Sequence, residues 1–376
     1  MRFDFLVAAA VAASMVSAHP GHDHHQELAE RTAALQHTKK DLSHCAEKIR
    51  ARGLEKRSIE RRAALATHLM KRNNLKDRDL AGLLNVSHHS DTEYTLETPE
   101  STLFASNNSC VLSPESIEGP YYVSGEYVRK NIVESEPGVD LTLDLQVLDI
   151  ETCDPVTGAY LEIWHCNSTG VYSGVSSGGD YESAPENLNT TFMRGAVKTD
   201  EDGVGQFETL FPGHYTGRTT HIHVMLHVNA TPLANGTIRS TTASHVGQIF
   251  FDQDLINDVE DLSPYTTNTQ ALTVNADDFI LEAIAETSDP FVQYVLLGDS
   301  LADGLLAWLS FGVNSSLISN VSAAATYYEE QKFLQAVLAD YLCRMMLIHA
   351  YDICEPEDGT QQWRNVLASL GKQLCK

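Results

Sequence analysis

Two histidines at strand spacing are the residues whose type and arrangement most directly suggest chemistry. They lie in the segment Thr220-His-Ile-His-Val-Met-Leu-His-Val228. Side chains two positions apart on a β-strand point to the same face, so His221 and His223 would project together at a separation suited to one metal ion. His227 shares that face and is equally consistent with a residue that lines the interior. The opposite face would pack into a core through Ile222, Val224, Leu226 and Val228.

Two tyrosines and an arginine stand close to these histidines in the sequence. Tyr215 precedes His221 by six residues and Arg218 precedes it by three, both within Phe211-Pro-Gly-His-Tyr-Thr-Gly-Arg218. Farther upstream, Trp164-His-Cys-Asn-Ser-Thr-Gly-Val-Tyr172 reads as a strand end followed by a glycine-containing turn that presents Tyr172. The sequence thus supplies two phenols, two imidazoles and one cation that could meet at one site.

Phenolate and imidazole ligands together favour iron in its ferric state. Phenolates are hard anionic donors, and a tyrosine of pKa about 10 becomes a ligand only because a metal stabilises its charged form. The ferrous oxygenases instead combine two histidines with one carboxylate. The His-x-Asp/Glu matches, at His25 and His89, lie outside the segment that is predicted to carry the strands. The residue types would therefore suit iron(III) if the two tyrosines bound the same metal as the two histidines, which the types alone do not establish.

A β-rich segment would position these side chains. The segment from Val139 to Val147 alternates apolar and polar residues strictly, which predicts a strand with one buried face. Residues 160–166 and 220–228 also read as strands, and turn signals separate them. These signals are Asp154-Pro155, Ser177-Gly-Gly-Asp180 and Asp200-Glu-Asp-Gly203. Short strands between such turns predict a mainly β protein with a β-sandwich.

Helical segments are expected on both sides of the sandwich. From Glu27 to about Leu84 the chain is rich in Ala, Leu, Glu, Lys and Arg and lacks Pro, which favours helix. A second helical pattern begins at about Tyr327. The predicted organisation is a signal peptide at 1–18, a His-rich terminus and helical segment at 19–105, the sandwich domain at 106–325, and an extension of unassigned role at 326–376.

Taken in order, these motifs resemble the intradiol ring-cleavage dioxygenases, specifically their secreted fungal branch. The resemblance runs from about Cys110 to Ser315. Its motifs are Gly-Pro-Tyr-Tyr beginning at Gly119, the turns that carry Tyr172 and Tyr215, the Arg-x-x-His-x-His pattern from Arg218 to His223, and Gln248 within Gly-Gln-Ile-Phe-Phe251. The resemblance implies the same sandwich fold that the strand pattern predicts.

The resemblance also implies a set of roles around a non-haem Fe(III). Tyr172 and Tyr215 match the equatorial and axial tyrosinate ligands, and His221 and His223 match the equatorial and axial imidazoles. Arg218 and Gln248 match residues that face the substrate, and Tyr121 matches a position that lines the pocket. The gap between His223 and Gln248 is longer than in bacterial relatives, with Asn229–Ser244 expected as an extended hairpin.

The family's activity sets the functional expectation. Its members cleave a catechol between the two hydroxylated carbons with O2 and give a muconate-type diacid. Tyr215 would accept a substrate proton, and Arg218 would stabilise negative charge that develops beside the ring. A small aromatic diol and O2 are therefore the expected partners in aromatic compound catabolism, and the N-terminal helices would pair two subunits as a homodimer.

Composition and termini bear on the compartment. A formal net charge of −25 argues against nucleic acid and anionic membranes as partners. Residues 1–18 read as a signal peptide, which predicts an extracellular, secreted protein. Glycosylation sequons agree with secretion and begin at Asn85, Asn107, Asn167, Asn189, Asn229, Asn235, Asn314 and Asn320. Seven cysteines leave at least one unpaired, and we predict a disulfide between Cys110 and Cys153, which flank the first strand.

Two other functions compete with this interpretation. A secreted protein could keep the sandwich and bind a metal or an aromatic compound without turning anything over. Alternatively, the histidine cluster from His19 to His25 could sequester metal ions, although a polar terminus with incidental affinity explains it as well. A match to the hydrolase pattern Gly-x-Ser-x-Gly at Gly174–Gly178 lacks the helix that such a motif requires after it.

Overall fold

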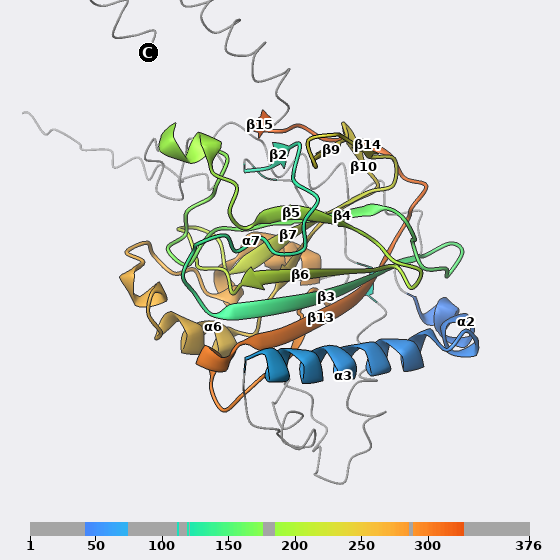
Figure 1. Cartoon of the computed structure of the whole chain (residues 1–376), viewed down its shortest axis with the longest axis horizontal. Helices are drawn as coiled ribbons and strands as arrows, with labels where there is room; N and C mark the ends of the chain where they lie inside the picture. Colours follow the sequence, from blue (N-terminus) through green and yellow to red (C-terminus); the bar gives the residue numbers. More distant parts are fainter. Residues whose placement is uncertain are drawn as a thin grey trace, which may run out of the picture. The chain divides into compact units, whose positions relative to one another are not determined.

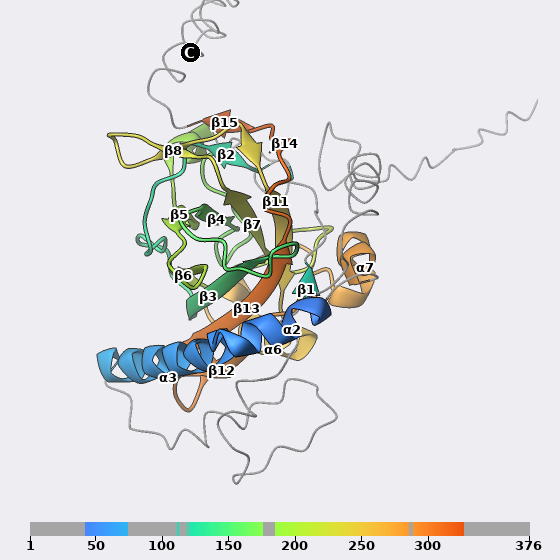
Figure 2. The same ribbon diagram turned by 90° about the vertical axis from the view of Figure 1, so that its right-hand side faces the viewer.

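Two β-sheets packed face to face form the centre of the molecule (Figures 1 and 2). The computed structural model describes residues 42–73, 111–112, 119, 121–175, 185–285 and 289–326. The chain forms two compact units, Met1–Ala325 and Thr326–Lys376. Apart from Thr326, the second unit lies outside the described residues, as do the predicted signal peptide and the cluster from His19 to His25. All further description concerns the first unit.

The first sheet has the order β1-β13-β3-β6, with β12 beside β13. It consists of β1 (Val111–Leu112), β13 (Leu305–Val313), β3 (Asp140–Asp149), β6 (Val204–Leu210) and β12 (Gln293–Leu296). The second sheet is antiparallel with the order β11-β7-β4-β5. It consists of β11 (His245–Phe250), β7 (His221–His227), β4 (Tyr160–Trp164) and β5 (Arg194–Lys198). The predicted β-sandwich is confirmed.

The core lies between the inner faces of the two sheets. Alternate residues of β3, including Leu143 and Leu145, face inward and are fully buried. They belong to the same apolar cluster as Ile163 of β4 and Ile222 and Val224 of β7. Burying apolar surface contributes about 25 cal/mol per Å². This cluster therefore fixes which face of β7 is left for polar side chains.

Short elements complete the fold around the two sheets. The remaining helices are α2 (Ala46–Ala51), α3 (Leu54–Arg72), α6 (Gln253–Glu260) and α7 (Phe279–Ala285), with short 3-10 turns at Ser43–Cys45, Pro185–Asn189, Tyr265–Thr267, Asn275–Asp277 and Leu301–Asp303. The remaining strands are β2 (Val123–Ser124), β8 (Thr231–Pro232), β9 (Ile238–Arg239), β10 (Thr242–Ala243), β14 (Ser319–Asn320) and β15 (Ala325–Thr326). The predicted hairpin at 229–244 appears as the antiparallel pair β8 and β9. No described helix is both long and apolar enough to cross a membrane.

The prediction that β3 buries only one face is wrong. Every residue of β3 after Asp140 is buried, including its polar positions. The reason is α3, which lies along the outer face of β3 and β13 (Figure 2). Asp144 of β3 accepts hydrogen bonds from Arg61 at 3.0 Å and from Arg62 at 3.1 Å, and both arginines belong to α3. The polar face of the strand is thus a binding surface for the helix.

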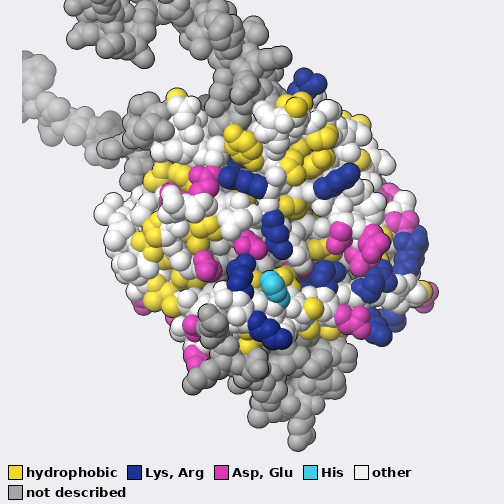
Figure 3. Space-filling model, in the orientation of Figure 1, with side chains coloured by type: hydrophobic (Ala, Val, Ile, Leu, Met, Phe, Trp, Pro, Cys, Tyr) yellow, Lys and Arg dark blue, Asp and Glu magenta, His cyan; other side chains and the backbone are white. Residues whose placement is uncertain are grey.

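An alternation of opposite charges marks where the N-terminal helices meet the sandwich. Figure 3 shows Lys and Arg side chains interspersed with Asp and Glu over α2 and the neighbouring end of α3. Lys48 pairs with Asp154 at 3.3 Å, and Arg57 pairs with Asp202 at 2.7 Å. Exposed pairs of this kind contribute roughly 0–1 kcal/mol each. Basic residues of α2 and α3 therefore contact acidic residues of the sandwich. The buried contacts of Asp144 stabilise this attachment more than the exposed pairs do.

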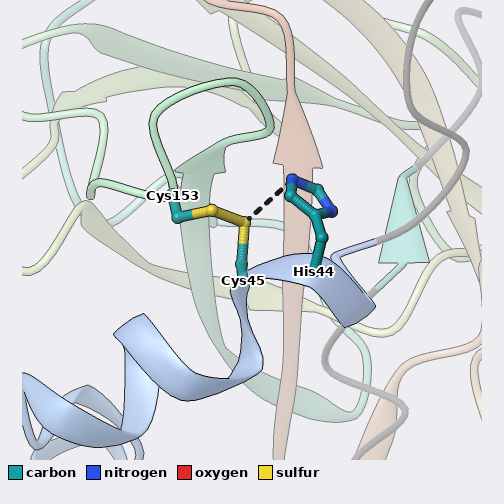
Figure 4. A group of neighbouring side chains, drawn as sticks. All are labelled: His44, Cys45 and Cys153. Atoms are coloured by element: carbon teal, nitrogen blue, oxygen red, sulfur yellow. Dashed lines mark hydrogen bonds between the residues drawn. A yellow bond between two sulfur atoms is a disulfide. The ribbon is translucent and has the colours of Figure 1, made fainter.

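One disulfide joins the N-terminal segment to the sandwich, and it corrects a prediction. Cys153 is bonded to Cys45, so the predicted pair with Cys110 is wrong. The segment before α2 comes back to the turn after β3, a long-range approach that the spacing of cysteines does not reveal (Figure 4). His44 lies beside the two sulfurs, and the three possible donor atoms are within 4.8 Å of one another. Because both sulfurs are in the disulfide, neither is a thiolate that could bind a metal.

Candidate metal centre

The face of the second sheet that points away from the core carries the polar side chains. His223 of β7 pairs with Trp164 of β4, and Trp164 pairs in turn with Arg194 of β5. On the other side of β7, His223 pairs with Gln248 of β11. Paired residues share a face of an antiparallel sheet. The apolar partners predicted for the opposite face are in the core, except Val228, which follows β7 and is exposed.

The four predicted ligands lie together and are buried. The Nε2 atoms of His221 and His223 are 3.2 Å apart, and the Oη of Tyr215 is 3.4 Å from His221 Nε2. The ring centre of Tyr172 is 5.6 Å from that of Tyr215 and 6.4 Å from that of His223. At most 2% of each side chain is exposed. The structure therefore brings together side chains that are 51 residues apart in the sequence (223 − 172).

The hydrogen bonding of His221 fixes which ring nitrogen is free to bind a metal. Its Nδ1 lies 2.6 Å from the carbonyl oxygen of Thr219. A carbonyl can only accept, so Nδ1 carries the proton and Nε2 presents a lone pair toward His223. Burial and the charge of Arg218 lower the pKa of His221 to about 3, so the ring is neutral at physiological pH. The ring of Trp164 stacks on that of His223 at 4.7 Å, which holds the second imidazole in place.

The two tyrosines are buried phenols that would ionise only beside a cation. Burial raises the pKa of both phenols well above the ordinary value. Tyr172 Oη is buried and has no hydrogen-bond partner among the described residues. An unsatisfied buried hydroxyl costs free energy, and a metal ion at this point would satisfy it. Two phenols and two imidazoles with converging donor atoms fit iron(III) by ligand type.

Arg218 and Gln248 lie beside the ligands in a fixed arrangement. Arg218 Nη2 donates to Gln248 Oε1 at 2.6 Å, and Arg218 Nε donates to Asp278 Oδ2 at 2.9 Å. Because arginine only donates, the Gln248 carbonyl must face it and the amide nitrogen must point elsewhere. Arg218 Nη1 and Gln248 Nε2 are both buried without a partner among the described residues. The site thus holds two donors that could bind developing negative charge.

Asp278 is a residue of this site that the sequence did not indicate. Its Oδ2 accepts from Arg218 and from the backbone of Thr219, while its Oδ1 accepts from the backbone of Ile280 and Leu281 in the first turn of α7. Burial opposes ionisation, but the Arg218 charge and the backbone hydrogen bonds from Leu281 and Thr219 together outweigh it and lower the pKa of Asp278. An Asp just before an apolar helical run is a recognisable N-cap signal. The sequence therefore carries a signal for the helix cap, but nothing in it indicates the ion pair between Asp278 and Arg218.

The segment with the Gly-Pro-Tyr-Tyr motif also reaches the ligands. Tyr121 stacks on Tyr172 with ring centres 4.4 Å apart and meets the edge of Tyr215 at 5.8 Å. Gly119 has a φ of +73°, and a Cβ there would lie 3.3 Å from His223 Cε1. Only glycine adopts this backbone freely and leaves room for the imidazole. The structure thus places Tyr121 against both tyrosines.

Three other histidines near the motifs have structural partners. His165 Nε2 lies 2.8 Å from Thr209 Oγ1, and His214 Nδ1 lies 2.7 Å from Glu260. His227 Nε2 lies 2.8 Å from Glu162. Burial alone would lower the pKa of His227, but the hydrogen bond and charge of Glu162 raise it. Cys166 is buried and free of a disulfide.

The fold and the site define a β-sandwich protein with a candidate centre of two tyrosines and two histidines. A family model described as Dioxygenase matches residues 117–275, which include all four candidate ligands, Arg218 and Gln248. An intradiol ring-cleavage dioxygenase from Tetranychus urticae is 33% identical in sequence, and the match covers 57% of this chain and 99% of that one, with a TM-score of 0.46. The chain belongs to the intradiol ring-cleavage dioxygenase family.

Curated relatives are similar over a shorter stretch. Catechol 1,2-dioxygenase 1 of Acinetobacter lwoffii is 36% identical over 107 residues, which cover 27% of this chain and 32% of that protein. Catechol 1,2-dioxygenase of Candida albicans is 33% identical over 125 residues, which cover 32% of this chain and 38% of that protein. The chain therefore spans about a third of the length of the curated relatives it matches.

Proposed function

We propose that this protein is a non-haem iron(III) dioxygenase that opens catechol-type rings between the two hydroxylated carbons. The observation that carries the proposal is the convergence of two phenols and two imidazoles, with Tyr172 Oη buried and without a partner among the described residues. Tyr172, Tyr215, His221 and His223 would hold the metal. Both atoms of O2 would enter the product, a muconate-type diacid, as the curated relatives named catechol 1,2-dioxygenase suggest.

The residues of this chain would divide the work around a bound diol. Iron(III) bound here would draw electron density from the diol and make its ring reactive toward O2. Tyr215, which lies beside His221 and would be a phenolate when iron is bound, would accept a proton from a substrate hydroxyl at its Oη. Arg218 Nη1 and Gln248 Nε2 would donate hydrogen bonds to the charge that develops beside the ring. Tyr121 and Trp164 would exclude water by packing on Tyr172 and His223.

A visible absorption spectrum tests this proposal. Protein supplied with iron(III) should show a burgundy tyrosinate-to-iron charge-transfer band, and catechol added without O2 should shift it. Tyr172→Phe should weaken or abolish the band, whereas Tyr294→Phe, a change in β12 of the other sheet, should leave it intact. A protein that stays colourless after iron is supplied would refute the metal centre. Oxygen uptake with catechol and a diacid product then separate an enzyme from a binding protein without turnover.

Asp278→Asn is expected to lower kcat for catechol roughly 10- to 100-fold, because misplacing a positioned group by about 1 Å can cost this much. The amide keeps the shape of the helix cap but loses the charge that orients Arg218. Steady-state rates on samples with equal iron content provide the measurement. Asp303→Asn is a matched control, since Asp303 also caps a helical turn, with Ser300, outside the site. Equal kcat in both variants would contradict an orienting role for Asp278.

We also propose that the protein is secreted and glycosylated and that it forms a homodimer. Among the described sequons, Asn189, Asn229, Asn235 and Asn320 are exposed, which supports glycosylation. Asn167 is only half-exposed, and its side chain bonds Glu136 and the backbone of Thr169 and Val171, so we expect no glycan there. Mass shifts on deglycosylation of protein from the culture medium, and sedimentation of the purified protein, test these proposals. Activity on bulky diphenols equal to that on catechol would support an extracellular plant or fungal aromatic as the substrate.

A further inference from the structure

A second group of buried ionisable side chains lies on the same sheet face as the candidate metal centre. Glu162 of β4, Arg194 of β5 and His227 of β7 belong to it, and Glu126 joins them from the segment after β2. None of these side chains is more than 1% exposed. Arg194 Nη1 lies 3.6 Å from Glu126 Oε1, and His227 pairs with Glu162. The proposed ring cleavage uses none of them, and buried ion pairs are costly features that call for an explanation.

Arg194 is the member of this group that contacts a candidate ligand. Its guanidinium carbon lies over the ring of Tyr172, 5.8 Å from the ring centre. Its Nε donates to the backbone oxygen of Ser173 at 2.9 Å and to Ser173 Oγ at 3.0 Å. One side chain therefore contacts both the Tyr172 ring and the residue that follows it. Its Nη1 and Nη2 make no hydrogen bond among the described residues.

Tyr172 needs such support because of where it lies in the chain. His221 and His223 belong to a strand whose register is set by two neighbours. Tyr172 instead follows the end of β4, in a turn between Gly170 and Gly174, which have φ values of +80° and +74°. The backbone of a residue in such a turn is not fixed by hydrogen bonds to neighbouring strands. Tyr172 Oη itself makes no hydrogen bond to the described residues, so its ring must be held by packing alone.

We propose that Arg194 is a positioning residue that holds Tyr172 in place as a metal ligand and supplies a fixed positive charge beside its ring. The inference rests on the proposed iron site. Arginine suits this role because it stays charged when buried and can stack on aromatic rings. Its charge would act in a medium of low dielectric, where electrostatic effects are strong. Glu126, at 3.6 Å, would in turn fix the position of the guanidinium.

Two properties of the iron-loaded protein should depend on Arg194 apart from its activity. The first is iron affinity, because groups that orient a ligand typically change metal affinity roughly 10- to 100-fold when mutated. The second is the energy of the charge-transfer band. A cation beside the tyrosinate stabilises the donor electrons, so loss of the cation should move the band to longer wavelength. Both can be measured without substrate.

The test compares iron binding and the visible spectrum of four variants with those of the unmodified protein, using iron(III) supplied as its citrate complex. Arg194→Gln should bind iron roughly 10- to 100-fold more weakly and absorb at longer wavelength. Arg194→Lys should keep the band closer to its original wavelength, because it keeps the charge. Arg194→Gln combined with Glu126→Gln avoids leaving a buried carboxylate alone and guards against failure to fold. Arg62→Gln is a matched control, since Arg62 is also buried, paired with an Asp and 5.5 Å from an aromatic ring centre, in the other half of the molecule.

The outcomes separate this inference from the proposed function. If the unmodified protein is coloured and the Arg194 variants fold, bind iron with equal affinity and keep the same band, Arg194 has no such role. If Arg62→Gln weakens iron binding as much as Arg194→Gln does, the effect is one of general destabilisation and the inference also fails. A colourless unmodified protein would instead remove the iron site itself.

Discussion

Replacing Arg218 by glutamine is expected to lower kcat for catechol by roughly 10²–10³-fold, the effect of removing one preorganised donor from an active site. Arg218 is fully buried, and its Nη1 has no partner among the described residues. Glutamine is shorter and uncharged, so it places no charged donor where Arg218 Nη1 lies. Initial rates on samples of equal iron content measure the effect. An iron-loaded Arg218→Gln protein with undiminished kcat would show that the arginine is only structural.

The folding stability of the Arg218 variant must be measured as well, because Arg218 forms an ion pair with the buried carboxylate of Asp278. The side chains of both Arg218 and Asp278 are fully buried, so Arg218→Gln alone leaves Asp278 without its partner. Breaking a buried pair in this way costs about 3–5 kcal/mol. The double variant Arg218→Gln with Asp278→Asn removes both charges and should recover much of the stability. It should not recover kcat, and that difference separates folding from chemistry.

Asp144→Asn is expected to reduce the free energy of unfolding by about 3–5 kcal/mol, because it leaves the buried Arg62 and the partly buried Arg61 without their counter-ion. Asp144 is fully buried and bonds Arg61, Arg62 and Gln206. Urea denaturation at neutral pH measures the loss. Asp140→Asn, at the exposed start of the same strand, is the matched control and should change stability by less than about 0.5 kcal/mol. Equal losses in the two variants would contradict the anchoring role of the cluster.

The same cluster predicts the sign of a pH effect. Burial alone would raise the pKa of Asp144, but the hydrogen bond from Arg61 and the charges of both arginines lower it below the ordinary value. A group whose pKa is lower in the folded state stabilises the fold above its unfolded pKa, about 3.9 for Asp, and this contribution is lost as pH falls through the folded value. The stability difference between the unmodified protein and Asp144→Asn should therefore shrink below about pH 4.

The sandwich and the convergence of the four candidate ligands could be predicted from the sequence because both depend on short sequence patterns. Alternation along β3 and the spacing of His221 and His223 follow directly from the period of two in a strand. The turns that present Tyr172 and Tyr215 contain glycine and could be recognised by their order along the chain. In each case the pattern that predicts the feature lies within about ten consecutive residues.

The features that escaped prediction depend on contacts between distant segments. Nothing local to Asp144 shows that α3 will cover it, so the polar positions of β3 resembled a solvated face. Asp278 is 60 residues from Arg218, and the two meet only because α7 packs against β11 through Phe250. Cys45 and Cys153 are separated by 108 residues. Such pairs are determined by tertiary packing, which a single sequence does not reveal.

The bond between Cys45 and Cys153 changes what proteolysis in the N-terminal segment can accomplish. Helix α3 contains the dibasic pairs Lys56-Arg57, Arg61-Arg62 and Lys71-Arg72, and all of them follow Cys45 and precede the sandwich strands. A protease that cut at any of these pairs would leave the upstream fragment covalently attached to the turn after β3. Such a product would have two chains that migrate as one species until a reducing agent is added, so denaturing gels run without reductant would conceal the cut.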